Sequence, residues 1–185
     1  MIPAHPLIAW SPMLLLLVLA ARTDLRSGRI PNQISLTLIA LGLLRGLVAW
    51  LGGAPGDPMR LALLGLATGL ALTIVFFLLG ALGAGDVKLM AGVGAWVGPV
   101  LALQIFAVTA LVAMAIAIAT VLVRGKALAL VRSATIALCN LFFVFGSKLG
   151  FLRDARQDCP SVGPTLPWAV PVLVAALAVA CLRAA

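Results

Sequence analysis

Long stretches without a charged residue are the feature that most limits what this chain can fold into. Residues 61–82 contain no charge over 22 positions, and residues 89–123 contain none over 35. About 20 apolar residues suffice for a helix to cross a bilayer, where its backbone polar groups must be satisfied internally. The chain is 64% hydrophobic and 10% charged, whereas soluble domains carry roughly a quarter charged residues. The sequence therefore predicts an all-α polytopic membrane protein, with residues 1–185 forming one integral-membrane domain.

The apolar runs predict a bundle of about six transmembrane helices. The stretch 89–123 is too long for one span, and Gly98-Pro99 supplies a break within it. A moderately apolar patch at 134–146 is too short to span and is expected to lie at the membrane surface. The expected spans are residues 6–21, 34–50, 61–82, 87–97, 101–123 and 168–182.

The basic residues predict the orientation of the bundle. Of thirteen Lys and Arg residues, ten fall in segments 22–32, 83–88 and 124–166. Because loops rich in Lys and Arg stay in the cytoplasm, these segments are expected inside, and 52–59 and 98–100 outside. Arg45, near the distal end of its span, is expected to snorkel to the far interface, although an interior-facing, ligand-binding role is the alternative. The net charge of +8 thus reflects topology in a lipid bilayer and indicates no nucleic-acid partner.

Two aspartates are the candidate functional residues. All five acidic residues are Asp, and Asp24 and Asp86 each follow an apolar run on the predicted cytoplasmic side. A carboxylate kept at membrane depth is costly and suggests a functional site. Two neighbouring carboxylates can share a proton, as in aspartic peptidases. The structural alternatives are that Asp86 caps a helix beginning at residue 87, and that nearby arginines neutralise Asp24.

The surroundings of Asp86 add three supporting residues. Gly83 and Gly85 allow close helix approach and unusual backbone angles. Lys88 could orient a substrate or a phospholipid head group, or simply snorkel to the interface. The single histidine, at position 5, and three widely separated cysteines indicate no metal site and no cofactor.

The segments D-L-R-S-G-R-I-P-N at 24–32 and G-A-G-D-V-K-L at 83–89, followed by W-V-G-P at 96–99, resemble the type IV prepilin peptidases. These are membrane aspartic peptidases of the G-x-G-D class. The resemblance implies that Asp24 and Asp86 are catalytic, that Asn32 closes the first motif, and that the chain is a single peptidase domain. It also implies removal of prepilin leader peptides at the cytoplasmic face of the bacterial inner membrane.

The same resemblance implies the partners and the subtype. Prepilins or pseudopilins would be the substrates, with the pilus assembly machinery as a possible partner. The chain starts directly with a span, so it looks like the short form associated with Flp (tight-adherence) pili, without the N-methyltransferase domain of larger members. One departure is Pro167-Trp168-Ala169, where the family pattern has P-Y-G.

Two other functions are compatible with the residues alone. A small ion- or proton-coupled transporter could use the same two aspartates, although the arginines around Asp24 would oppose a cation. A noncatalytic scaffold for a secretion machine is also compatible.

Overall fold

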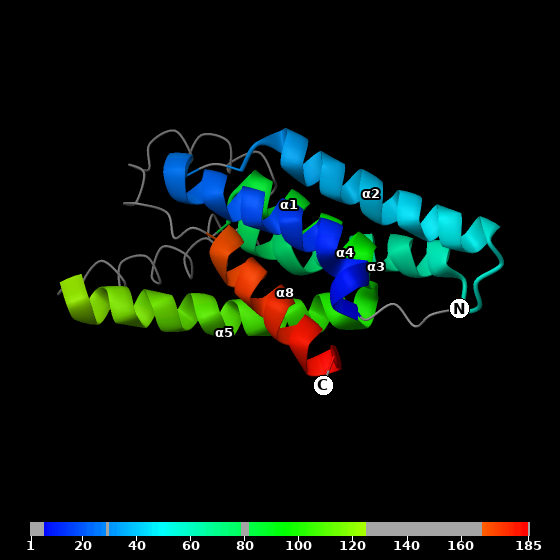
Figure 1. Cartoon of the computed structure of the whole chain (residues 1–185). Helices are drawn as coiled ribbons and strands as arrows, with labels where there is room; N and C mark the ends of the chain where they lie inside the picture. Colours follow the sequence, from blue (N-terminus) through cyan, green and yellow to red (C-terminus); the bar gives the residue numbers. More distant parts are fainter. Residues whose placement is uncertain (1–5, 29, 79–81, 125–167, 185) are drawn as a thin grey trace, which may run out of the picture.

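The computed structural model describes residues 6–28, 30–78, 82–124 and 168–184, and these residues form six α-helices without a strand (Figure 1). Three of them, α2, α3 and the segment Pro99–Ile116 of α5, are long and apolar enough to cross a membrane. The prediction of an all-α helical bundle is therefore confirmed. The helices are α1 Pro6–Ser27, α2 Asn32–Leu51, α3 Pro58–Leu78, α4 Ala84–Val97, α5 Pro99–Arg124 and α8 Ala169–Ala184.

Two predicted helix boundaries are wrong, and both errors concern the candidate site. Helix α1 continues through residues 22–27, which were expected to form a loop, because this turn packs on α8 and Asp24 accepts a hydrogen bond from the N–H of Ala169. It ends at Ser27, and the following Gly28 has a φ of 61°, the left-handed conformation common after helices. Helix α4 begins at Ala84 instead of residue 87. The surface segment expected at 134–146 lies outside the described residues.

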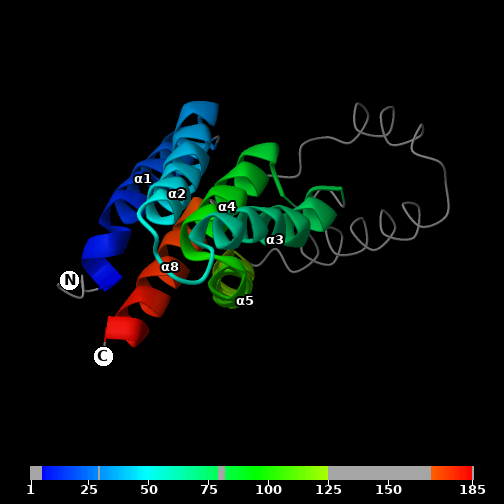
Figure 2. The same cartoon turned by 90° about the vertical axis from the view of Figure 1, so that its right-hand side faces the viewer.

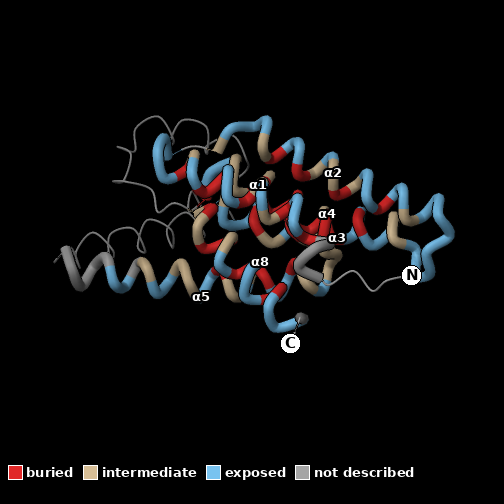
Figure 3. The backbone as a smooth tube through the Cα atoms, in the orientation of Figure 1, coloured by how far each residue is buried: buried red, intermediate tan, exposed pale blue. Residues whose placement is uncertain are grey.

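The short helix α4 occupies the centre of the bundle. It has 14 residues, which is about 21 Å at 1.5 Å per residue and less than the roughly 30 Å of bilayer hydrocarbon. Figure 2 shows it between α2 and α3, and every residue from Leu89 to Trp96 is buried (Figure 3). Other helices, instead of lipid, therefore surround most of α4.

Glycines bring the neighbours of α4 into backbone contact. Helix α3 carries Gly65 and Gly69, a G-x-x-x-G pair whose members face Gly94 and Met90. A Cβ atom at either α3 glycine would overlap a carbonyl oxygen of α4. A second such pair on α2, at positions 42 and 46, packs the same way against Ala95 and Ala62. Small residues spaced by four let membrane helices approach closely, where van der Waals packing drives association.

Arg45 binds the far end of α4 and does not simply snorkel away. Its Nη1 donates a hydrogen bond of 2.6 Å to the carbonyl oxygen of Trp96, and its guanidinium carbon lies 5.8 Å from the centroid of the Trp96 ring. The last carbonyls of a helix lack partners within the helix and carry partial negative charge. Arg45 therefore caps α4 at the end opposite to Asp86.

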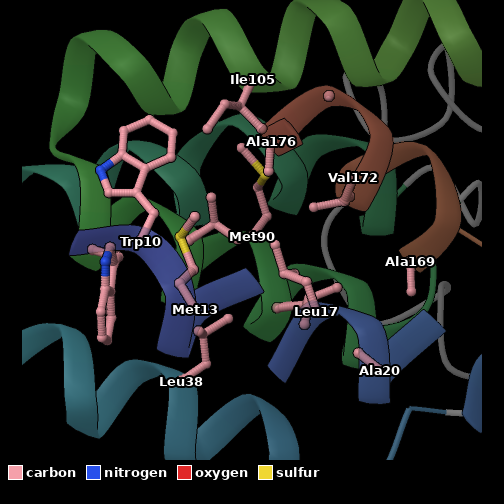
Figure 4. Packing of buried hydrophobic residues seen from close by; sticks show 14 of the residues in the cluster. Trp10, Met13, Leu17, Ala20, Leu38, Met90, Ile105, Ala169, Val172 and Ala176 are labelled. Carbon is pink, nitrogen blue, oxygen red and sulfur yellow. The ribbon is translucent and has the colours of Figure 1, made fainter. Parts of the chain in front are cut away.

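The core between α1 and α8 fixes the remaining part of the site. Met13, Leu17 and Ala20 of α1 are fully buried and pack in one cluster with Ala169 and Val172 of α8 (Figure 4). Because these α1 residues recur every three to four positions, the same face continues to Asp24. The packing therefore sets the start of α8 against the end of α1.

Candidate active site

Asp24 lies in the last two turns of α1 and faces α8. Only 8% of the residue is exposed. Its Oδ2 accepts a hydrogen bond of 3.1 Å from the backbone N–H of Ala169, the first residue of α8. The N-terminus of a helix carries free N–H groups and partial positive charge, which favour an anion. The structure thus gives Asp24 an environment that suits a carboxylate.

Asp86 is the third residue of α4 and is partly buried. Its Oδ2 accepts a hydrogen bond of 2.9 Å from the N–H of Gly83, the residue before the helix. Gly83, and not Asp86, is therefore the N-cap residue, which corrects the capping alternative. Asp86 instead closes the first turn from inside the helix, as the third residue of a capping box does.

The start of α8 touches the surroundings of both aspartates. Ala169 binds Asp24, while Trp168 and Val172 line a small cavity that Asp86 also lines. The two carboxylates are close enough that the negative charge of Asp24 raises the pKa of Asp86. The structure therefore brings the two predicted residues, 62 positions apart in sequence, to one end of the bundle.

Burial dominates the protonation of both groups, which lie outside the three candidate spans. Burial raises the pKa of Asp86, the N–H of Gly83 opposes this, and the charge of Asp24 adds to it, so that the pKa lies at about 6. Burial also raises the pKa of Asp24, opposed by the N–H of Ala169. At a pH near 6 such a pair is able to hold one proton between its members.

The supporting residues predicted from the two motifs contact one another. Lys88 Nζ donates a hydrogen bond of 3.0 Å to Asn32 Oδ1, at the first residue of α2. A Cβ atom at Gly85 would lie 3.2 Å from the Cβ of Ile30, which is tighter than an ordinary contact. The first motif therefore packs directly on the second, and Gly85 allows the approach.

Two residues that were not predicted from the sequence line a cavity beside Asp86. Its volume is about 10 Å³, roughly the space of one water molecule. Thr73 of α3 and Thr109 of α5 line it and are 2% and 1% exposed. Their sequence signal was a threonine within an otherwise apolar span. The full lining comprises Thr73, Asp86, Leu89, Met90, Phe106, Thr109, Trp168 and Val172.

The described residues contain no group of three or more His, Cys, Asp or Glu side chains that could hold a metal ion.

Comparison with known families agrees with the motifs. The model of the type IV leader peptidase family matches residues 12–119, more than half of the chain, and the match includes both candidate aspartates. The chain belongs to this family of membrane peptidases, and the resemblance to prepilin peptidases is confirmed. No curated protein and no solved structure matches it.

Proposed function

We propose that this protein is an aspartic endopeptidase in which Asp24 and Asp86 form the catalytic pair, within one peptidase domain spanning residues 1–185. The observation that carries the proposal is the convergence of both carboxylates on the start of α8, one bound to Ala169 and the other beside Trp168 and Val172. Membership of a leader peptidase family favours this reading over an ion- or proton-coupled transporter.

Peptide hydrolysis by a carboxylate pair needs one member ionised and one protonated. The ionised carboxylate removes a proton from water as the water oxygen attacks the scissile carbonyl carbon. The protonated carboxyl group donates to the carbonyl oxygen and stabilises the charge that develops there. Asp86 beside Asp24 meets the requirement, because mutual repulsion and burial disfavour a doubly ionised pair.

The proposed substrates are prepilins or pseudopilins, whose leader peptides are removed at the cytoplasmic face of the bacterial inner membrane. Two observations and one general rule support the cytoplasmic face. The site lies where α1 ends and α4 and α8 begin, Arg22 and Arg26 stand beside Asp24 in sequence, and basic residues favour the cytoplasm. The Lys88–Asn32 pair lies at the same end of the bundle and is a candidate contact for the substrate or a lipid head group.

Substitution of each aspartate by asparagine tests the function. Asp24→Asn and Asp86→Asn should each abolish the mobility shift of a co-expressed prepilin while leaving protein abundance in the membrane unchanged. The amide nearly keeps the shape of the carboxyl group but cannot act as a base. Asp57→Asn is the matched control, because Asp57 is exposed in a turn with φ of 48°, a conformation that Asn tolerates. Processing by either site variant at the rate of this control would refute the assignment.

The membrane face has its own test. Single cysteines introduced at Arg26 and Ala54, both exposed, in a background without Cys139, Cys159 and Cys181, should react with an impermeant maleimide from opposite sides. Arg26→Cys should react only from the cytoplasm. Labelling of both positions from one side would contradict the proposed orientation.

A further inference from the structure

We propose that the two aspartates have fixed and different roles: Asp24 is the ionised base, Asp86 is the protonated acid, and Thr73 and Thr109 hold one water molecule against Asp86. This inference rests on the proposed function, which leaves open which carboxylate carries the shared proton. It also assigns roles to two buried threonines that neither motif contains.

The neighbours of Asp24 offer it a hydrogen-bond donor. The N–H of Ala169 points at Oδ2 from the start of a 16-residue helix, and a donor at a helix N-terminus stabilises the ionised form of a carboxyl group. Asp86 accepts one such bond as well, from Gly83, so the difference between the two aspartates lies in the cavity that Asp86 lines. The fixed N–H of Ala169 also holds the carboxylate of Asp24 in one orientation. A base that removes a proton from a water molecule needs such an orientation.

The cavity beside Asp86 presents hydrogen-bond acceptors. Thr73 Oγ1 donates to the carbonyl oxygen of Gly69 at 2.7 Å, and Thr109 Oγ1 donates to that of Ile105 at 2.7 Å. A hydroxyl has one proton and two lone pairs. Because both protons are committed to the backbone, each threonine can only accept a hydrogen bond from anything in the cavity.

One water molecule fits this arrangement best when Asp86 is protonated. The cavity has room for about one water (about 10 Å³). With Asp86 neutral, its O–H donates to the water, and the two water protons go to Thr73 and Thr109. With Asp86 ionised, the water must give one proton to the carboxylate, which leaves one threonine oxygen without a donor. The neutral acid therefore satisfies every group, and Oδ2 still accepts from Gly83.

Among the described residues, the N–H of Gly83 lowers the pKa of Asp86, and burial and the charge of Asp24 outweigh it. Helices α3, α5 and α8 face it across the cavity with Thr73, Phe106, Thr109, Trp168 and Val172, none of which is charged. The described charged neighbours are Asp24, which disfavours a second negative charge, and Lys88 on the same helix, whose Nζ is bonded to Asn32. Burial raises the pKa of Asp86 to about 6, in the same direction.

These roles give a balanced first step of hydrolysis. An O–H bond of the attacking water breaks and its proton moves to Asp24, while the water oxygen forms a bond to the carbonyl carbon. The carbonyl π bond breaks and its oxygen takes the proton of Asp86. The products are a tetrahedral diol, neutral Asp24 and ionised Asp86. On collapse of the diol, one of its hydroxyl protons returns to Asp86, the carbonyl re-forms and the C–N bond breaks. The proton held by Asp24 moves to the leaving nitrogen, which restores ionised Asp24 and neutral Asp86.

The composition makes the proton positions directly measurable. The chain has five acidic residues, all Asp, so purified protein labelled with ¹³C at the Asp carboxyl carbon gives five side-chain signals. Asp24→Asn and Asp86→Asn assign two of them. In the resting wild-type enzyme, Asp24 should titrate at lower pH than Asp86. The reverse order, or equal midpoints, would overturn the division of roles. Because no substrate is present, this result is independent of whether the protein cleaves prepilins.

Isosteric variants test the water bridge by the sign of a shift. Thr73→Val or Thr109→Val removes one of the two threonine oxygens that accept from the water. Ionisation of Asp86 then leaves no threonine oxygen without a donor, so the titration midpoint of Asp86 should fall by about half a pH unit. If the threonines served only packing, a more apolar cavity would leave the midpoint unchanged or raise it.

Thr68→Val is the matched control. Thr68 lies on the same helix α3 and also donates to a backbone carbonyl, that of Leu64 at 2.7 Å, but does not line the cavity. Its substitution should leave the Asp86 midpoint in place. If the Asp86 midpoint stays or rises in either folded cavity variant, Thr73 and Thr109 do not hold a water molecule against Asp86. Each variant tests the same water independently of the other.

Discussion

The contact between α3 and α4 yields a sharp prediction about Gly69. A Cβ atom added there would overlap the carbonyl oxygen of Met90 and lie 2.9 Å from its carbonyl carbon and 3.1 Å from the Cα of Ala91. Ordinary contacts begin near 3.4 Å, so Gly69→Ala must separate the two backbones by at least about half an ångström. The atoms that the Cβ would meet belong to the backbone of α4, so they cannot move away by a change of side-chain rotamer. The clash should therefore cost about 3 kcal/mol, the upper end for overpacking.

Helix propensity offsets part of that cost. Alanine is better than glycine in a helix by about 1 kcal/mol, which leaves a net loss near 2 kcal/mol. Cleavage should fall as well, because Met90 lines the cavity beside Asp86 and Thr73 donates to the carbonyl of Gly69.

The assay is reversible unfolding of the purified protein in mixed micelles with increasing dodecyl sulfate, followed by tryptophan fluorescence. Ala67→Leu is the control, because Ala67 lies on the exposed face of the same helix and its enlargement should change stability by less than about 0.5 kcal/mol. A Gly69→Ala protein as stable as the wild type would show that the close approach of α3 and α4 is not what holds the bundle together.

Four further predictions concern the two ends of α4. Arg45→Met should destabilise the protein by about 1–2 kcal/mol in the same assay, since it removes the hydrogen bond and ring contact to Trp96, with cleavage per folded molecule unchanged. A double-mutant cycle of Lys88→Met and Asn32→Ala, measured as free energies of unfolding, should give a coupling of about 0.5–1 kcal/mol. Additive losses of stability would mean that the hydrogen bond between Lys88 and Asn32 contributes nothing. Cleavage, measured as kcat/KM, should fall about tenfold per pH unit as pH rises beyond about 6, where Asp86 loses its proton. Because the folded pKa of Asp86 is raised, the free energy of unfolding should decline as pH rises from 3.8 to about 6. Asp86→Asn should reduce this decline, and the raised pKa of Asp24 accounts for the part that remains; a profile identical to the wild type would count against this explanation.

Much of the fold followed from the sequence because lipid imposes a strict rule on helix length and charge. The apolar runs located α2, α3, α5 and α8 to within a few residues. Helix α4 was harder, since its start depends on the Gly83 cap and on Asp86 bonding backward, which apolar periodicity does not register. The continuation of α1 past residue 21 was missed for a related reason. Its last turn is polar, and it is held by contacts with α8 that include the hydrogen bond from the N–H of Ala169 to Asp24.

In the candidate site, too, some residues could be predicted from the sequence and others could not. The motifs identified Asp24, Asp86 and their neighbours, because acids beside apolar runs are conspicuous. Thr73, Thr109 and the N–H of Ala169 could not be found in that way. Their places depend on which helix faces which, and in this bundle glycines at positions 65, 69 and 94 set that arrangement through backbone contacts.

A kinetic comparison of purified variants shows whether Asp24 and Asp86 act as one catalytic unit. Initial rates of prepilin cleavage in proteoliposomes should be measured for wild type, Asp24→Asn, Asp86→Asn and the double variant. When residues act as one unit, removing either of them costs about as much activity as removing both. We therefore expect the same residual rate for both single variants and the double variant. Losses that multiply in the double variant, or substantial turnover by either single variant, would contradict this expectation.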